Sequence, residues 1–204
     1  MNILAKIKKN RFIRGLYFLY KNYIHAPASK FGFYGKDINI IPPITISNPE
    51  NVYLHGNNGL NNATILTTNA RFVMYPNSGA ASGLKVITGN HARIVGFPYR
   101  CITEEMKPQG FDKDVIVKED VWMGVNVTLL SGVTLERGVT VAAGAVVSRS
   151  MPPYCICAGV PAKVIKFYWT IDQILEHEKQ IYPESARYKV TELEDIFAQY
   201  KATK

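Results

Sequence analysis

His91 combines a reactive side chain with an unusual place in the chain. It ends the segment ITGNH, and the stretch that follows, residues 92–114, contains glycines and prolines and is predicted to be a loop. A neutral imidazole takes a proton from a hydroxyl or an amine near neutral pH. A lone histidine is usually a surface residue, but long loops in compact folds are often functional. The position of His91 at the start of this loop therefore favours a general base.

Three nearby polar residues are candidates for binding the acceptor, the molecule that His91 would deprotonate. Asn90 precedes the histidine, and Glu104 and Glu105 lie inside the loop. Either glutamate could orient the imidazole or bind the acceptor. The alternative is that both glutamates are ordinary exposed side chains.

The other three histidines have weaker claims. His55, in LHGNN, is predicted at a corner where glycine or another polar residue would serve as well. His25 and His177 fall in predicted helices and are expected to be solvated.

A six-residue repeat must position these side chains. Residues 117–152 divide into VKEDVW, MGVNVT, LLSGVT, LERGVT, VAAGAV and VSRSMP, with apolar residues at the first and fifth positions of each. Apolar residues two apart point to the same face of an extended segment. The turns between segments are predicted at Asp120, Asn126, Gly132, Gly138 and Gly144. Each unit is therefore predicted to be one short strand and a corner.

Three such sextets would close one triangular coil. Coils would stack at the strand spacing of about 4.8 Å, so that each strand pairs above and below around a column of aliphatic side chains. The predicted fold class is all-β, a parallel β-helix. An ordinary β-sandwich is the alternative, and it would need longer strands at irregular spacing.

The repeat is looser before the loop. Apolar pairs begin at Ile38 and Ile40, their spacing drifts from six to eight, and the pattern breaks over residues 60–83. The early coils are therefore predicted to carry insertions at their corners. Val115 and Val117 restart the strict register.

Two long runs carry a family resemblance. DVWMGVNVTLLSGVTLERGVTVAAGAVV (residues 120–147) and MPPYCICAGVPAKVIK (residues 151–166) resemble the hexapeptide-repeat acyltransferase superfamily, closely its sugar O-acetyltransferases of polysaccharide gene clusters. The resemblance covers roughly residues 38–200. It implies a left-handed parallel β-helix, a homotrimer, acetyl-CoA as co-substrate and a sugar acceptor. His91 also matches the position of the family's catalytic histidine.

Cofactor contacts are implied where the family's motifs match this chain. The matching residues are Trp122, Gly124, Ala143, Gly144, Ser148, Arg149 and Lys163. Arg149 stands where the family usually has lysine, and with Lys163 it would meet the phosphates of CoA. Val125 replaces the family's small polar residue after the WxG motif. Ala143 and Gly144 are also what a tight corner requires, so a purely structural role is the alternative.

The activity that the resemblance implies is acetyl transfer from acetyl-CoA to a sugar hydroxyl of a surface polysaccharide or its precursor. His91 would take the hydroxyl proton as the oxygen attacks the thioester. The alternatives are an N-acetyltransferase acting on an amino sugar and a catalytically silent β-helix scaffold. A γ-class carbonic anhydrase would bind zinc through three histidines, but His55 and His91 lie about two coils apart. No metal site is expected.

The basic charge of the chain lies in one arm. The net charge is +8, and of the 24 basic residues eight lie within residues 1–36, which hold no acid, while the other 16 balance the 16 acidic residues. A nucleic-acid-binding face is therefore not indicated. The arm is predicted to be an amphipathic helix up to about His25, without the features of a signal peptide. It would either cap the β-helix or rest, through residues 1–24, on an anionic membrane surface.

Three regions are predicted in chain order. They are a basic helical arm (1–37), a β-helix acetyltransferase domain (38–166) and a C-terminal helical extension (167–204). In the extension, Thr170 with Gln173 and Thr191 with Glu194 resemble capping boxes, which predict helices over residues 170–181 and 191–200. These helices would cover the open strand edge of the last coil.

The cysteines bear on the compartment. Cys101, Cys155 and Cys157 are odd in number and lack the spacing of a disulfide framework. Free thiols in a reducing cytoplasm are therefore predicted. The predicted location is cytoplasmic, and peripheral contact with a membrane is the interpretation that the arm adds.

Overall fold

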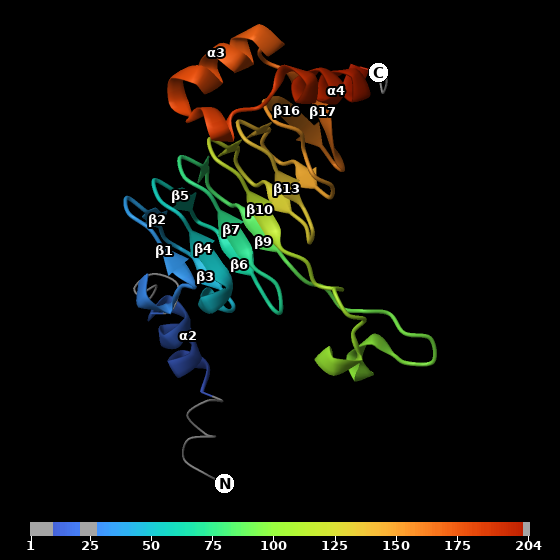
Figure 1. The fold of residues 1–204 in the computed structure, drawn as a ribbon. Coiled ribbons are helices and arrows are strands. Elements are labelled where there is room, and N and C mark those ends of the chain that lie inside the picture. The colour runs from blue at the N-terminus through green and yellow to red at the C-terminus, as the bar shows by residue number, and fades with distance from the viewer. Residues whose placement is uncertain (1–9, 21–27, 202–204) are drawn as a thin grey trace.

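The computed structural model of the chain describes residues 10–20 and 28–201. Residues 1–9, 21–27 and 202–204, and with them His25 and parts of the predicted arm helix, lie outside the described residues. The described chain forms a triangular column of stacked coils with helices at both ends (Figure 1). This is the predicted β-helix.

Three sheets form the sides of the column. Sheet A holds β1 (Phe33–Tyr34), β4 (Val52–Leu54), β7 (Phe72–Met74), β10 (Val115–Val117) and β13 (Thr134–Leu135). Sheet B holds β2 (Asn39–Ile41), β5 (Gly59–Asn61), β8 (Gly79–Ala80), β11 (Trp122–Met123), β14 (Thr140–Val141), β16 (Cys155–Gly159) and β17 (Ala162–Phe167). Sheet C holds β3 (Thr45–Ile46), β6 (Thr64–Leu66), β9 (Lys85–Ile87), β12 (Thr128–Leu129) and β15 (Val146–Val147). Each corner is named here by the two sheets that it joins: A–B, B–C or C–A.

The coils after the loop follow the predicted repeat. Trp122 pairs with Thr140 and Thr128 pairs with Val146, so one coil takes three sextets. All five predicted turn residues have positive φ angles: Asp120, Asn126, Gly132, Gly138 and Gly144. The apolar sextet positions point inward and are buried, among them Val121, Met123, Val127 and Leu129. The prediction of a three-sextet coil around an aliphatic column is confirmed.

The coils before the loop are longer, as the drifting spacing predicted. Val52 pairs with Phe72 and Gly59 with Gly79, so each of these coils exceeds three sextets. The predicted corner insertions are confirmed: where the apolar spacing breaks, around residues 60–83, the strands β5 to β8 continue the three sheets. The extra residues sit at the corners and shift the hydrophobic spacing without interrupting the ladder. The strand pattern was therefore present but hidden by the corner insertions.

Two helices cover the last coil. They are α3 (Ile171–Ile181) and α4 (Val190–Lys201), and Figure 1 places them over the end of the column formed by β16 and β17. The capping box of Thr170 and Gln173 is confirmed. The box predicted at Thr191 and Glu194 is wrong: α4 begins at Val190, and the Glu192 carboxylate accepts the Lys189 N–H at 2.7 Å. Glu192, and not Glu194, therefore caps α4, which begins before the predicted start at Thr191.

A buried polar network attaches these helices to the coils. The Tyr154 hydroxyl donates to the Glu178 carboxylate at 2.5 Å, and both residues are fully buried. Arg137 donates to both carboxylate oxygens at 2.9 Å. The prediction that His177 is solvated is wrong, because its ring packs against Trp169 at 4.5 Å between centroids and its side chain is only 22% exposed.

The N-terminal helix lies outside the coils. In α2 (Arg11–Leu19) the Asn10 side chain accepts the N–H groups of Phe12 and Ile13, and none of the helix residues is buried. The part of the arm that the structure describes therefore has the helical form predicted, with its apolar side chains exposed.

Short helical turns complete the description. They are η2 (Ala28–Lys30), η3 (Pro49–Asn51), η4 (Tyr99–Cys101), η5 (Glu104–Met106) and η6 (Glu184–Ala186). Across residues 10–20 and 28–201, no helix has the length and apolarity needed to cross a bilayer.

Candidate active site

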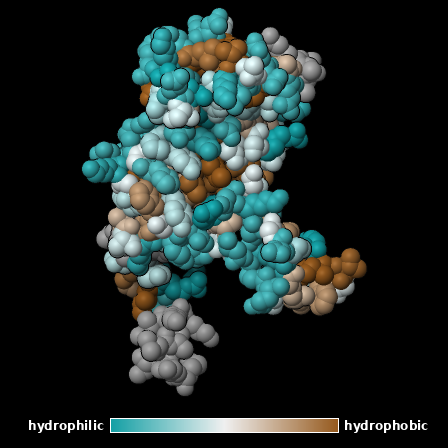
Figure 2. Space-filling model, in the orientation of Figure 1, coloured by the Kyte–Doolittle hydropathy of each residue, from teal (hydrophilic) through white to brown (hydrophobic). Residues whose placement is uncertain are grey.

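The loop 92–114 leaves the column at the C–A corner between β9 and β10 and projects away from it (Figure 1). Its far end is apolar: Val95 is fully exposed, and Phe97 is half exposed. Figure 2 shows hydrophobic surface at the end of this projection. Beyond the buried Ala92, the loop therefore presents an apolar tip to its surroundings.

Side-chain hydroxyl groups form hydrogen bonds that stabilise the C–A corner from which the loop leaves. The Thr88 hydroxyl donates to the Ala70 carbonyl at 3.1 Å, and the Ser131 hydroxyl donates to the Thr88 carbonyl at 2.7 Å. One coil earlier, the Thr67 hydroxyl donates to the Asn48 carbonyl at 2.9 Å. Thr67 and Thr88 are fully buried. Because these side chains link successive coils, the backbone just before His91 is held firmly.

His91 itself faces outward. Its backbone N–H donates to the Asn90 side-chain oxygen at 2.8 Å. Its ring packs edge-on against the Tyr99 ring, at 5.5 Å between centroids. Among the described residues no hydrogen-bond partner is found for the imidazole. The ring is thus available to a substrate.

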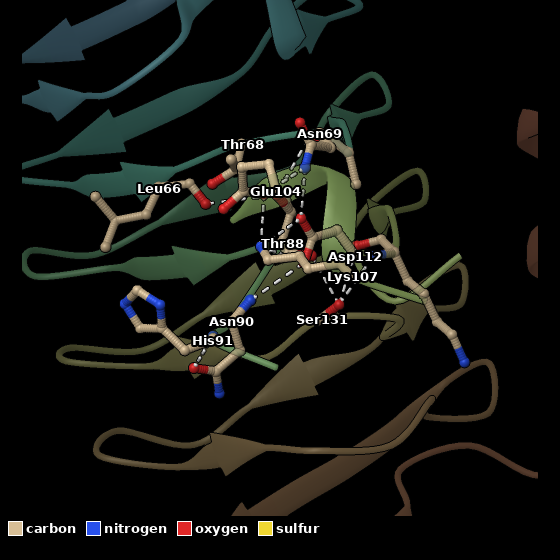
Figure 3. Close-up of polar contacts among 12 residues, drawn as sticks. Leu66, Thr68, Asn69, Thr88, Asn90, His91, Glu104, Lys107, Asp112 and Ser131 are labelled. Carbon is tan, nitrogen blue, oxygen red and sulfur yellow. Dashed lines mark hydrogen bonds and ion pairs between the residues drawn. The ribbon is translucent and has the colours of Figure 1, made fainter. Parts of the chain in front are cut away.

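The two loop glutamates have partners other than the imidazole. Glu104 pairs with Lys107 at 2.8 Å and accepts from Asn69 at 2.8 Å, and Glu105 accepts from the Thr103 hydroxyl at 2.8 Å. The Lys107 ammonium and the Asn69 amide lower the pKa of Glu104. Figure 3 shows the His91 ring pointing away from the cluster that contains Glu104. The structure therefore does not bring either glutamate to His91.

Three residues at the base of the loop were not identified from the sequence: Asn69, Lys107 and Asp112. Asp112 is nearly buried and is joined to Lys107 at 3.2 Å and to Asn69 at 3.0 Å. Burial opposes the charge of Lys107, but its hydrogen bonds with Glu104 and Asp112 raise its pKa overall. Asn69 lies 43 residues before Asp112, and Lys107 and Asp112 belong to the loop outside the repeat, so no periodic signal marked the three residues. The position of Asp112 just before Val115, where the strict register restarts, was the one feature of the sequence that could have indicated it.

The B–C corner brings three of the predicted cofactor residues together. A Cβ on Gly124 would lie 2.7 Å from the Ala143 nitrogen, so the corners of these coils touch. Gly144 has a φ of +72°, and a Cβ added there would meet nothing within 4 Å. In the described chain, the N–H groups of Val125 and Ala143 donate to no carbonyl. This corner offers a narrow, open edge with free backbone donors.

The remaining predicted cofactor residues are spread over other parts of the column. Ser148 and Arg149 lie exposed at the C–A corner of the last coil, on the same edge as His91 but two coils further along. Lys163 lies on β17, paired with Ala158. Trp122 lies on the outer face of sheet B, 53% exposed. Within one chain, sheet C separates His91 from the B–C corner.

A polar groove of about 490 Å³ runs across the A–B corner onto sheet B. Glycines form part of its lining because Gly59 and Gly79 lie on the outer face of adjacent strands. Asn57 donates to the Asn77 side chain at 2.9 Å along one edge, and Trp122 forms part of the other. The groove therefore combines amide hydrogen-bonding groups with an aromatic wall.

His55 lies near this groove but has a packing role. Its ring stacks on Phe33 and on Tyr75, each at 4.9 Å between centroids. Within the described residues, no group of three metal-ligating side chains is found.

Sequence comparison relates the chain to acetyltransferases. No family model matches it. It is 32% identical over 104 residues to a probable macrolide acetyltransferase of Lysinibacillus sphaericus, covering 51% of this chain and 56% of that protein. It is 57% identical over 54 residues to a polysialic acid O-acetyltransferase of Escherichia coli O1:K1 / APEC (26% and 18% covered). It is 52% identical over 52 residues to a 2,3,4,5-tetrahydropyridine-2,6-dicarboxylate N-acetyltransferase of Brevibacillus brevis (26% and 22% covered). The chain thus spans little more than half the length of the first relative and about a fifth of the other two.

Solved structures share the fold over most of the chain. A hexapeptide-repeat acetyltransferase of Vibrio cholerae, complexed with acetyl coenzyme A, superposes with a TM-score of 0.60 at 19% identity, covering 83% of this chain and all of that one. A maltose O-acetyltransferase of Clostridium difficile gives a TM-score of 0.59 at 22% identity, covering 83% and 90%. The fold is the left-handed parallel β-helix that the resemblance implied. The chain is therefore similar in fold to a solved hexapeptide-repeat acetyltransferase and similar in sequence, over about half of its length, to a probable macrolide acetyltransferase.

Proposed function

We propose that the protein is an acetyl-CoA-dependent O-acetyltransferase that acts on a sugar hydroxyl of a surface polysaccharide or its precursor. The observation that carries the proposal is the placement of His91: an exposed imidazole without a hydrogen-bond partner in the described chain, at the root of a projecting loop and on a corner held by buried hydroxyls. The names of the relatives support acetyl transfer, and one of them is a polysialic acid O-acetyltransferase.

His91 acts as the general base in this proposal. Its imidazole takes the proton of the sugar hydroxyl, which is otherwise a poor nucleophile, as that oxygen attacks the acetyl carbonyl. The rigid C–A corner keeps the imidazole in place, and this matters because small displacements of a catalytic group are costly in rate. Asn90, which already holds the His91 N–H, is our candidate for contact with the acceptor, together with Glu104 and Glu105.

The B–C corner fits the pantetheine arm of acetyl-CoA, which supplies an acetyl group activated as a thioester. Gly124 and Gly144 keep side chains away from the edge, so the arm can lie against the backbone. The free N–H of Ala143 suits an amide oxygen of the arm. The free N–H of Val125 suits the acetyl oxygen as negative charge develops on it.

Charged residues near the end of the column suit the phosphates. Arg149 and Lys163 are exposed and lie on the last coil and on β17. An arginine binds phosphate oxygens through paired N–H donors, and a lysine does so as a point charge. Ser148 and Trp122 are proposed as further contacts along the same path.

The separation of these groups within one chain supports a homotrimer. His91 and the B–C corner lie on opposite sides of sheet C, so one chain cannot hold both reactants at one point. We propose that His91 of one subunit faces the B–C corner and the polar groove of its neighbour. The groove, with its amide edge and its Trp122 wall, would then receive the sugar acceptor.

The arm is proposed to hold the trimer at an anionic membrane surface. The apolar side chains of α2 are exposed, with Phe12 at 74% and Tyr17 at 65%, and the arm is basic. Anionic lipids attract such helices, and salt weakens the attraction. Deletion of residues 1–24 should reduce binding to phosphatidylserine vesicles. Unchanged binding would contradict the proposed membrane contact.

Replacement of His91 tests the proposed base. In His91→Asn, acetyl transfer to the best acceptor in a panel of sugars and surface polysaccharides should fall about 100- to 10,000-fold, while acetyl-CoA affinity changes by no more than a few-fold. A general base acts only in its unprotonated form, so the wild-type rate should rise with pH and the variant should lack this rise. His55→Asn removes a stacked histidine elsewhere and is the matched control, with little expected effect. A His91→Asn enzyme that retains more than about a tenth of the rate would place the base elsewhere.

An amino-sugar acceptor is the second candidate. The same base and donor serve an amine, and one relative is an N-acetyltransferase. Amino sugars in the same panel would decide between the two, since thiol release with only those acceptors would favour N-acetylation. Absence of transfer to every acceptor would favour the scaffold alternative.

A further inference from the structure

The loop 92–114 is tied back to the column by one nearly buried carboxylate. The Asp112 side chain is 3% exposed, and its ion-pair partner Lys107 is 9% exposed. The Asn69 amide donates to the same carboxylate at 3.0 Å from the preceding coil. Asp112 therefore joins the loop to the column across a distance of 43 residues in the sequence.

The same carboxylate touches the backbone that leads into His91. The Asn90 N–H donates to Asp112 Oδ1 at 3.3 Å. The backbone of Gly89 lies so close that an added Cβ would be 2.6 Å from this oxygen. The Asn90 side chain in turn accepts the His91 N–H at 2.8 Å. A continuous set of contacts thus runs from Asp112 through Asn90 to the His91 backbone (Figure 3).

The charges of the cluster favour this arrangement. Lys107 lies between two carboxylates, at 3.2 Å from Asp112 and 2.8 Å from Glu104. A nearly buried carboxylate without a partner would be costly, and Lys107 and Asn69 supply its partners. Glu104 is half exposed and, among the described residues, makes no contact with Asn90. The two acids of the cluster therefore differ: only Asp112 reaches the segment that carries His91.

We propose that Asp112 is a positioning residue for His91: it fixes the Gly89–Asn90 backbone and so sets where the imidazole stands relative to the substrates. This inference rests on the proposed function of His91. Asp112 does not touch the imidazole, so it acts through the backbone. Lys107 and Asn69 hold the carboxylate in the orientation that this role needs.

Kinetics of Asp112 variants test the inference. Asp112→Ala should lower kcat about 10- to 100-fold, the range expected when a catalytic group shifts by about an ångström, with the KM for acetyl-CoA within about twofold. Asp112→Asn keeps an oxygen that can accept the Asn90 N–H and should lose less activity. Asp114→Asn is the matched control, because this neighbouring carboxylate pairs with Arg71, at 2.6 Å, instead of Asn90. Its rate should stay within about twofold of wild type.

Two further readouts separate positioning from a general loss of fold. The pH dependence of the remaining Asp112→Ala activity should keep the wild-type shape, because the base is still His91. In a double-mutant cycle, Asp112→Ala should cost little more once His91 is replaced by Asn, because both changes act through one group. Thermal unfolding of each variant, followed by circular dichroism, identifies any that fail to fold.

The outcomes distinguish this inference from the proposed function. A large loss in His91→Asn together with a non-additive loss in Asp112→Ala supports both. A large loss in His91→Asn with no loss, or an additive loss, in Asp112→Ala overturns the positioning role and leaves the base in place. If Asp112→Ala does not fold, Asn69→Ala replaces it, because it removes an amide that orients the Asp112 carboxylate, and a wild-type kcat in that folded variant likewise overturns the role. Full activity of His91→Asn removes the base and the positioning role together.

Discussion

The coils before the loop and the coils after it enclose the same aliphatic column with different corners. After the loop, each coil comprises three sextets and turns at glycines such as Gly132, Gly138 and Gly144. Before the loop, the longer coils turn at asparagines such as Asn57 and Asn77, whose side chains bond to one another. The early corners thus carry asparagine side chains that bond to one another, whereas glycines hold three of the five late turns. The longer coils supply most of the groove, and Asp120, Val121 and Trp122 of the first regular coil complete it.

The loop marks the boundary between these two regions. His91 ends the last of the long coils, and Asp112 precedes the first strand of the regular ones. The loop therefore has regular three-sextet coils on one side and longer coils with asparagine corners on the other. This arrangement is consistent with catalytic groups on loops that a rigid scaffold positions.

The largest effect on stability is expected at a late corner. Gly138 has a φ of +71°, and an added Cβ would meet the ring of the fully buried Tyr154. Gly138→Ala should therefore lower the free energy of unfolding by about 3 kcal/mol through strain and overpacking. Gly59→Ala is the control in an early coil, because nothing lies within 4 Å of its Cβ position. Its change in urea unfolding should stay within about 0.5 kcal/mol, and equal losses in the two variants would contradict the comparison.

A smaller loss is expected when an early corner loses its buried amide. Asn58 is 2% exposed, accepts the Gly56 N–H at 3.0 Å and donates to the Tyr75 carbonyl at 2.8 Å. Asn58→Ala should cost about 2 kcal/mol, because it leaves buried backbone groups without partners. Asn57→Gly removes only the exposed bond to Asn77 and should change urea unfolding by about 0.5 kcal/mol or less. A neutral Asn58→Ala would mean that packing alone holds the early corners.

The smallest effect concerns the tyrosines that join the late coils to α3. Burial and then the hydrogen bond to Glu178 raise the pKa of Tyr154, and burial raises the pKa of Tyr168 and of Tyr182 to about 12. The unfolded chain releases these protons above pH about 10, whereas the folded chain retains them, so the free energy of unfolding should fall as pH rises from there. Tyr154→Phe should cost about 1 kcal/mol at neutral pH and make this alkaline fall shallower. An unchanged slope in the variant would assign the fall to other groups.

The sequence was sufficient to predict the turns and the buried apolar positions of the repeating coils after the loop. All five turn residues between Asp120 and Gly144 and the inward apolar positions follow from local periodicity, so they could be read directly. The placement of His91 at the root of the loop also followed, because the interruption of the repeat is visible. The corner insertions of the early coils also followed from the sequence, but the strand boundaries between residues 60 and 83 did not, because the insertions changed the spacing while the strands stayed in register.

The parts that depend on contacts distant in sequence could not be read. Asp112 meets Asn69 across 43 residues, and Arg137 meets Glu178 across 41. The prediction that His177 is solvated was wrong for the same reason, because Trp169 and Tyr154 pack against its ring only in the folded chain. Periodicity reports which face a residue occupies, whereas these contacts depend on which coils and helices lie beside that face.

The most direct test of the account is whether one site takes His91 from one subunit and the B–C corner from another. His91→Asn and Ala143→Trp each remove one half of the site, and Ala143 is exposed, so the larger side chain blocks the corner without entering the core. Each variant alone should be nearly inactive in acetyl transfer. Trimers reassembled from an equal mixture should regain about a quarter of wild-type activity, because about one site in four combines an intact histidine with an intact neighbouring corner. Mixed trimers, verified by mass spectrometry, that stay as inactive as the two parents would contradict a site shared between subunits.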